Sequence, residues 1–182
     1  MNHKGTVMLE TERLILRQFT PGDAEAMFRN WGGYARLEDA QEDMRGISKY
    51  ENSTYRWAIV LKDGNLTIGS ISAYKVDDLR NSLSVGYVIG EPWWHKKIMT
   101  EALCAVIKFF FEEVRVNRIA AQYNATNPRS GGVMLNSGMR YEGLLRQASR
   151  TGSDVFCYAI LAEDYFTTAL PQQPADTNHY PN

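Results

Sequence analysis

The hydrophobic period changes twice in the first third of the chain. Residues 9–17 end in near-alternation of apolar and polar positions, which predicts a strand. Apolar residues then recur at helical spacing, which predicts a helix that starts after residues 20–23 and stops at the glycine pair 32–33. A weaker repeat of the same spacing over residues 34–49 predicts a second short amphipathic helix.

From residue 55 the period is that of a strand. Two apolar runs, 57–61 and 67–74, flank an Asp-Gly turn and predict an antiparallel hairpin, and residues 83–90 predict another strand. An apolar stripe predicts a long helix over 100–114. The remaining predicted elements are a strand over 118–124, a helix over 128–137 closed by a glycine, and strands over 140–147 and 155–161.

This order of elements predicts a single α/β domain on a mixed sheet, over residues 1–170. Residues 171–182 are polar with little to bury, and predict a loose C-terminal tail. We expect the strand Val155–Leu161 to be exposed and able to pair with a second copy of the chain, which makes a homodimer a candidate assembly.

Composition narrows the class of protein. The 182 residues are 44% hydrophobic and carry 20 Lys and Arg against 21 Asp and Glu, which argues against a nucleic-acid binder. No run of about 18 apolar residues predicts a membrane span, and the first residues lack the apolar core of a signal peptide. We therefore expect a cytoplasmic protein without a membrane or nucleic-acid partner.

Cysteine and histidine offer little chemistry. The two cysteines, Cys104 and Cys157, lie in apolar stretches, which rules out a disulfide framework and predicts inert core residues. We expect Cys104 on the helix face toward the sheet. The three histidines have no spacing suited to zinc or to a Ser-His-Asp triad, so we expect no metal site.

Residues 86–103 are the most informative block. A strand leads through a short loop to the start of a long helix, where free backbone N–H groups and the helix dipole favour a phosphate or pyrophosphate. Lys96 and Lys97 would add positive charge beside them. A solvated loop before a capped helix explains the same local pattern. We expect the nearby Trp93 and Trp94 to be core or pocket-wall residues.

A second block begins at Asn127, where a strand ends, and places Ser130 in the first turn of the next helix. Such a hydroxyl can be exposed at the end of a sheet, where α/β domains usually bind ligands. Both residue types also serve as helix caps, and that alternative stays open.

The two blocks, their order and their neighbours closely resemble the GNAT acyl-CoA N-acyltransferases, nearest to the branch that acetylates the N-terminal amines of ribosomal proteins. The resemblance covers about residues 8–166 and rests on five stretches in register: 9–17, Gly86-Tyr87-Val88-Ile89-Gly90, Thr100-Glu101-Ala102-Leu103, Asn127-x-x-Ser130-x-x-Val133-Met134 and Gly138-Met139-Arg140-Tyr141-Glu142-Gly143.

The resemblance implies a mixed, mostly antiparallel twisted sheet, flanked by helices and splayed open between its fourth and fifth strands, here 83–90 and 118–124. Acetyl-CoA would enter the gap, its pantetheine arm pairing with the fourth strand and its pyrophosphate held by the loop that follows. A backbone N–H of Val88 or Ile89 would stabilise the oxyanion. The implied cofactor-binding residues are Tyr87, Val88, Ile89, His95, Lys96, Lys97, Ile98, Met99, Thr100, Asn127 and Ser130.

The implied activity is transfer of an acetyl group from acetyl-CoA to a primary amine, either a protein N-terminus or a small amine, by direct attack in a ternary complex. Ser130 and Asn127 are the implied catalytic residues: Ser130 would hydrogen-bond or protonate the departing thiolate, and Asn127 would orient the pantetheine or anchor the helix. For a general base, Glu142, Asp154, Tyr158 or a water chain would serve, although we expect Glu142 to be structural.

One departure from the family concerns the phosphate loop. Where the family has a Trp-Gly-Lys-Gly run, this chain has Trp94-His95-Lys96-Lys97. Glycine permits a positive φ, whereas a β-carbon there costs about 1–2 kcal/mol per residue. The loop either keeps the family's shape under strain or relaxes. The alternative function is a non-catalytic module of this fold that senses CoA or binds a protein.

Overall fold

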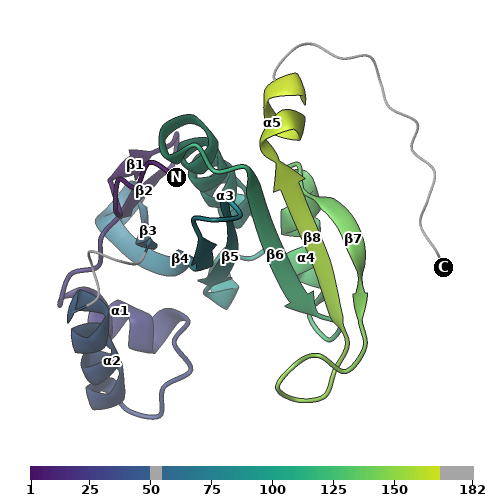
Figure 1. Ribbon diagram of the computed structural model, residues 1–182. Helices are drawn as coiled ribbons and strands as arrows, with labels where there is room; N and C mark the ends of the chain where they lie inside the picture. Colours follow the sequence, from purple (N-terminus) through teal and green to yellow (C-terminus); the bar gives the residue numbers. More distant parts are fainter. Residues whose placement is uncertain (50–54, 169–182) are drawn as a thin grey trace.

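The computed structural model describes residues 1–49 and 55–168, so the expected tail 171–182 lies outside the described residues. The described strands form one sheet in the order β1-β2-β3-β4-β5-β6-β8-β7 (Figure 1). Neighbouring strands are antiparallel except β5 and β6, which are parallel. The strands are β1 (Leu9–Glu10), β2 (Leu14–Arg17), β3 (Arg56–Leu61), β4 (Leu66–Asp77), β5 (Ser82–Ile89), β6 (Arg118–Asn124), β7 (Arg140–Leu145) and β8 (Val155–Leu161).

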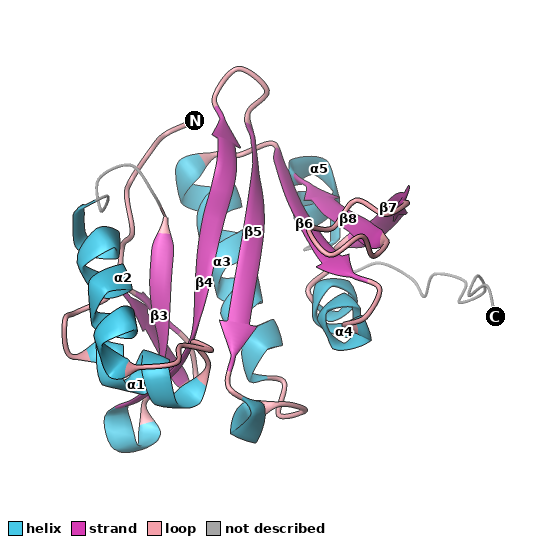
Figure 2. Cartoon of the chain, turned by 90° about the horizontal axis from the view of Figure 1, so that it is seen from below, coloured by secondary structure: helices cyan, strands magenta, loops and turns pink. Residues whose placement is uncertain are grey.

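Helices cover both faces of this sheet (Figure 2). The α-helices are α1 (Asp23–Asn30), α2 (Leu37–Lys49), α3 (Ile98–Phe109), α4 (Pro128–Asn136) and α5 (Ala162–Thr168). Helix α3 continues into a π-helical turn, η3 (Phe110–Val114), and two 3₁₀ turns, η1 (Asp63–Asn65) and η2 (Glu91–Trp93), join strands to their neighbours.

The alternation of side chains along β3 divides the core in two. Trp57 and Ile59 belong to the large cluster that α3 covers, whereas Ala58 and Val60 pack with residues of α1 and α2. All four are fully buried, because a strand covered by helices on both faces has no solvent-facing side.

The predicted order of elements is confirmed, with differences at their ends. The predicted strand 9–17 is two short strands, and the hairpin turn is the 3₁₀ turn η1, in which Gly64 has a φ of 74°. Helix α3 begins two residues earlier than expected, at Ile98. Helix α5 was not predicted.

The prediction that Val155–Leu161 is an exposed strand is wrong. This strand, β8, pairs with β6 on one side and with β7 on the other, so both of its edges are used. It takes the inner place because Tyr158 and Ile160 are buried in the core, whereas most β7 side chains are exposed. The edge strand on this side of the sheet is β7.

The predicted burial of Cys104 is also wrong. Its side chain is exposed, since the buried face of α3 carries its neighbours Ala102 and Leu103. Cys157 is only half-buried, and its Sγ accepts a hydrogen bond from Gln122 Nε2 at 3.3 Å.

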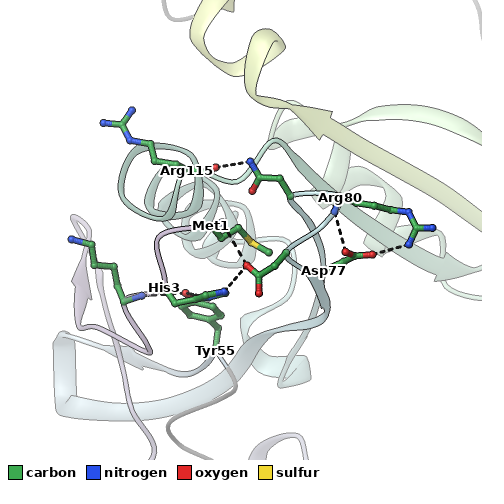
Figure 3. A network of polar contacts seen from close by, with 9 residues as sticks. Met1, His3, Tyr55, Asp77, Arg80 and Arg115 are labelled. Atoms are coloured by element: carbon green, nitrogen blue, oxygen red, sulfur yellow. Dashed lines mark hydrogen bonds and ion pairs between the residues drawn. The ribbon is translucent and has the colours of Figure 1, made fainter.

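Polar contacts hold the β5–β6 pair together at its start. The backbone carbonyl of Asn81 accepts hydrogen bonds from the N–H groups of Asn117 and Arg118, at 2.9 and 3.3 Å. The Asn81 side chain donates to the Arg115 carbonyl at 3.0 Å. Nearby, His3 links Tyr55 to Asp78, with contacts of 3.0 and 2.9 Å (Figure 3). The Asn81 contacts hold β5 and β6 together at the end where their pairing begins.

A buried carboxylate fixes α1 to the sheet. Asp23 accepts two hydrogen bonds from the Arg17 guanidinium, at 2.7 and 2.9 Å, and one from Thr67 Oγ1 at 2.6 Å. The N–H and hydroxyl of Thr20 complete the set, at 2.7 and 2.9 Å. Burial by itself would raise the pKa of Asp23, but these hydrogen bonds outweigh it and lower the pKa from 3.8 to about 2.

Replacing this carboxylate tests its contribution to stability. We expect Asp23→Asn to lower the free energy of unfolding at neutral pH by about 2 kcal/mol, since each pKa unit is worth about 1.4 kcal/mol. A lowered pKa stabilises the fold fully above about pH 4, and that gain disappears as the pH falls toward 2. Urea unfolding of both proteins across this range should show the gap closing. A gap that stays constant would contradict the assignment.

Candidate functional site

The site begins where β5 and β6 separate. The two strands pair only from Ser82 with Arg118 to Val85 with Ala121. Beyond these residues they diverge toward their C-terminal ends, with α4 beside β6 (Figure 2). The carboxyl ends of parallel strands are where open α/β sheets bind ligands. The predicted splay between the strands 83–90 and 118–124 is therefore present.

A cavity of about 420 Å³ lies at this opening. It is lined by Tyr87, Val88, Ile89, Trp93, Trp94, His95, Lys97, Ile98, Met99, Thr100, Asn127, Arg129, Ser130, Gly132, Val133 and Asn136. The structure thus brings together every residue expected to bind the cofactor except Lys96, whose side chain is exposed outside the lining.

Two hydrogen bonds fix the walls of the cavity. The Tyr87 hydroxyl donates to the Ser130 carbonyl at 2.9 Å, which ties β5 to the first turn of α4. The Trp94 indole N–H donates to the Ile89 carbonyl at 3.0 Å. Burial raises the pKa of Tyr87 above its usual value, so this phenol stays protonated at neutral pH and acts as a hydrogen-bond donor.

The entrance carries positive charge. The first turns of both α3 and α4 line the cavity, so the positive ends of two helix dipoles lie beside it. The Lys97 side chain lies on the same wall. The Arg129 guanidinium stacks over the Trp94 ring, 4.5 Å from its centroid. This arrangement suits a phosphorylated ligand with a narrow, partly apolar arm.

The phosphate loop keeps a left-handed backbone without its glycines. His95 has a φ of 61° and Lys97 a φ of 57°, the positions at which the family run has glycine. Of the two outcomes that the sequence left open, the structure has the strained loop and not the relaxed one. The loop therefore keeps a left-handed shape and lines the cavity with His95 and Lys97, at a cost of about 1–2 kcal/mol per residue.

The start of α4 presents two polar side chains to the cavity. Asn127 precedes the helix but its side chain makes no capping hydrogen bond. The Ser130 hydroxyl has no partner among the described residues, although its backbone N–H donates to the Asn127 carbonyl at 3.3 Å. The capping interpretation fails for both side chains, which leaves them available to a ligand.

The three residues considered as general bases lie outside the cavity lining. Glu142 forms a two-pronged ion pair with Arg118, as expected for a structural residue, and this hydrogen bonding keeps the pKa of Glu142 below its usual value. Asp154 accepts the Gln147 backbone N–H at 2.8 Å. Tyr158 is buried in an aromatic group with Tyr123 and Tyr141.

Sequence reasoning missed Arg129 as a lining residue. In the sequence, Arg129 is notable only as a positively charged residue between Asn127 and Ser130. Its place in the lining depends on stacking against Trp94, which is 35 residues away in the chain. Gly132, Val133 and Asn136 also line the cavity. They follow Arg129 at spacings of three and four residues, which places them on the same face of α4.

Two further findings concern the described part of the chain. Residues 1–49 and 55–168 contain no group of three or more His, Cys, Asp or Glu side chains placed to hold a metal ion. Within the same residues, every helix is too short or too polar to cross a membrane.

Comparison with known proteins gives the family. The model of the acetyltransferase (GNAT) domain matches residues 13–140. The uncharacterized N-acetyltransferase YoaA of Bacillus subtilis (strain 168) is 29% identical over 153 residues, covering 77% of this chain and 86% of that protein. The ribosomal-protein-serine acetyltransferase of Escherichia coli (strain K12) is 26% identical over 121 residues, covering 65% and 67%.

A solved structure shares the fold. The microcin C7 self-immunity acetyltransferase MccE, determined in complex with acetyl-CoA and AMP, superposes with a TM-score of 0.74 at 18% identity, covering 83% of this chain and 93% of that one. With the family match, the open sheet and the lined cavity, the chain belongs to the GNAT acetyltransferases. It is an N-acetyltransferase of that family, related to the ribosomal-protein branch.

Strain in the loop can be measured as stability. We expect His95→Gly and Lys97→Gly each to raise the free energy of unfolding by about 1 kcal/mol, because relief of strain exceeds the entropy that glycine adds to the unfolded chain. Lys96→Gly is the matched control: Lys96 has no positive φ, so glycine there should destabilise by about 0.5–1 kcal/mol. Chemical denaturation gives all three values, and equal effects at the three positions would contradict the assignment.

Proposed function

We propose that this enzyme transfers an acetyl group from acetyl-CoA to a primary amine, on a protein N-terminus or a small molecule. The observation that carries the proposal is the cavity at the point where β5 has parted from β6, which is lined by the end of β5, the start of α3 and α4. Acetyl-CoA has the matching parts: a narrow amide-containing arm and a diphosphate. The related structure with acetyl-CoA supports this choice of donor.

Different residues along the cavity would bind different parts of acetyl-CoA. Beyond Val85 the backbone of β5 is free to pair with an extended arm as an added strand would. The N–H groups at the start of α3, with Lys97, suit a diphosphate. Asn127 would orient the arm. We assign Arg129 to the phosphate-bearing end because its guanidinium stacks on Trp94, the residue that opens the phosphate loop.

When bound, acetyl-CoA supplies a thioester that a neutral amine attacks directly, with loss of the CoA thiolate. A backbone N–H of Val88 or Ile89 would stabilise the negative oxygen, since neither residue pairs with β6. The Ser130 hydroxyl, which is unpartnered among the described residues, would donate its hydrogen bond or proton to the leaving sulfur. Glu142, Asp154 and Tyr158 are not among the lining residues, so of the candidates considered a water chain would take the amine proton.

The acceptor amine would approach from the other face of the sheet. Gly86 is the first β5 residue after the pairing with β6 ends, and it has no side chain. The Tyr74 ring lies against it, because a β-carbon at Gly86 would be 3.2 Å from the ring. Acetyl-CoA would occupy the α3 and α4 side, so the acceptor would reach the thioester past Tyr74.

Calorimetric titration with CoA tests the donor. Binding is expected, followed by release of free thiol when acetyl-CoA is incubated with a panel of amines and N-terminal peptides. A folded sample that fails to bind millimolar CoA would overturn the proposal. Binding without thiol release in the presence of any amine would favour the non-catalytic alternative.

Ser130→Ala tests the leaving-group role. We expect kcat to fall by about 100-fold, the usual contribution of a general acid, with the KM for acetyl-CoA little changed. Ser130→Thr keeps the hydroxyl and should retain most of the activity. An Ala variant with unchanged kcat would remove Ser130 from the chemistry.

A further inference from the structure

A carboxylate in the first turn of α3 is held by the segment that precedes β2. Glu101 Oε1 accepts hydrogen bonds from the Thr11 hydroxyl and from the Arg13 backbone N–H, the latter at 3.0 Å. Glu101 Oε2 contacts Arg13 Nε at 2.7 Å and Arg13 Nη2 at 2.6 Å. Both carboxylate oxygens are therefore satisfied by residues more than 80 positions away in the chain.

The same arginine reaches the phosphate loop. Arg13 Nη1 donates to the Lys96 carbonyl at 3.1 Å. Lys96 lies between His95 and Lys97, the two residues with a strained left-handed backbone, and it is the one member of the loop outside the cavity lining. Arg13 thus holds the outer side of the loop, at the peptide that joins the two strained positions.

The charge of Glu101 gives Arg13 a second role. A carboxylate in the first turn of α3 suits the helix dipole but repels an anion bound at the same N-terminus. Burial would raise the pKa of Glu101, yet the hydrogen bonds from Thr11 and Arg13 keep it below its usual value, so the group is ionised. The Arg13 guanidinium neutralises that charge beside the phosphate loop.

We propose that Thr11, Arg13 and Glu101 form a brace that holds the glycine-free phosphate loop in its anion-binding shape. They are positioning residues: they act through Lys96 and the start of α3 and do not touch the ligand. The inference rests on the proposed use of acetyl-CoA. It explains how this chain keeps a left-handed loop at His95 and Lys97, since the brace opposes relaxation of that loop.

Kinetics with two thioester substrates distinguish this positioning role from a general structural one. Acetyl-CoA carries the diphosphate, whereas acetyl-pantetheine keeps the thioester arm without it. We expect Arg13→Ala to raise the KM for acetyl-CoA by about 10-fold or more with little change in kcat, while kcat/KM for acetyl-pantetheine stays within about twofold. Glu101→Gln weakens the hydrogen bonds to Thr11 and Arg13 but also removes a negative charge near the diphosphate, so we expect its KM for acetyl-CoA to rise by a smaller factor.

Controls use the same chain. Arg13→Lys keeps the charge but cannot bind Glu101 and the Lys96 carbonyl together as a planar fork does, so an intermediate KM is expected. Arg80→Ala breaks the exposed ion pair with Asp77 at the other end of β5. This variant should leave the KM and kcat for both thioesters unchanged. Urea unfolding identifies any variant that loses its fold, in which case Glu101→Gln and Arg13→Lys carry the test.

The glycine-loop background gives an independent measurement. With His95→Gly and Lys97→Gly the loop needs less support, so adding Arg13→Ala should raise the KM for acetyl-CoA by a smaller factor than in the wild type. An equal factor, an equal loss with both thioesters, or an unchanged KM would overturn the brace. A wild-type protein inactive with acetyl-CoA would instead overturn the proposed function itself.

Discussion

The parallel pairing of β5 with β6 stops after Val85 and Ala121, and the site depends on that stop. Unpaired backbone in the middle of a sheet needs a partner, because buried N–H and C=O groups are costly without one. The opening persists because its two ends are fixed differently. Asn81 ties the strands together where they start, while Tyr87 bonds across the gap to the first turn of α4.

Strain and support meet at the phosphate loop. The left-handed backbone at His95 and Lys97 is strained, and the hydrogen bond from Arg13 to the Lys96 carbonyl opposes its relaxation. A similar balance holds at Asp23 in α1. Its buried carboxylate is stabilised by hydrogen-bond donors from Arg17, Thr20 and Thr67. In both places a local feature is unfavourable, either a strained backbone or a buried charge. Hydrogen bonds from residues elsewhere in the chain offset its free-energy cost.

The hydrophobic pattern predicted the order of helices and strands. The family resemblance predicted most of the residues that line the cavity. The hydrophobic pattern placed β8 at an exposed edge because strand order is not encoded in periodicity, and only the burial of Tyr158 and Ile160 places it inside. Cys104 was assigned to the core from an apolar stretch, although one turn of α3 carries both buried and exposed positions. Arg129 and the Arg13–Glu101 contacts depend on distances between remote segments.

The tryptophans are unevenly placed. Of the four in the chain, Trp93 and Trp94 line the cavity, whereas Trp57 is sealed in the core with its indole N–H donated to the Val7 carbonyl. An indole in a cavity wall exchanges water for ligand when the cavity fills, and a sealed one does not. Intrinsic fluorescence of this protein therefore carries an optical signal of occupancy from Trp93 and Trp94, over a background from Trp57 and from Trp31, which lies outside the lining.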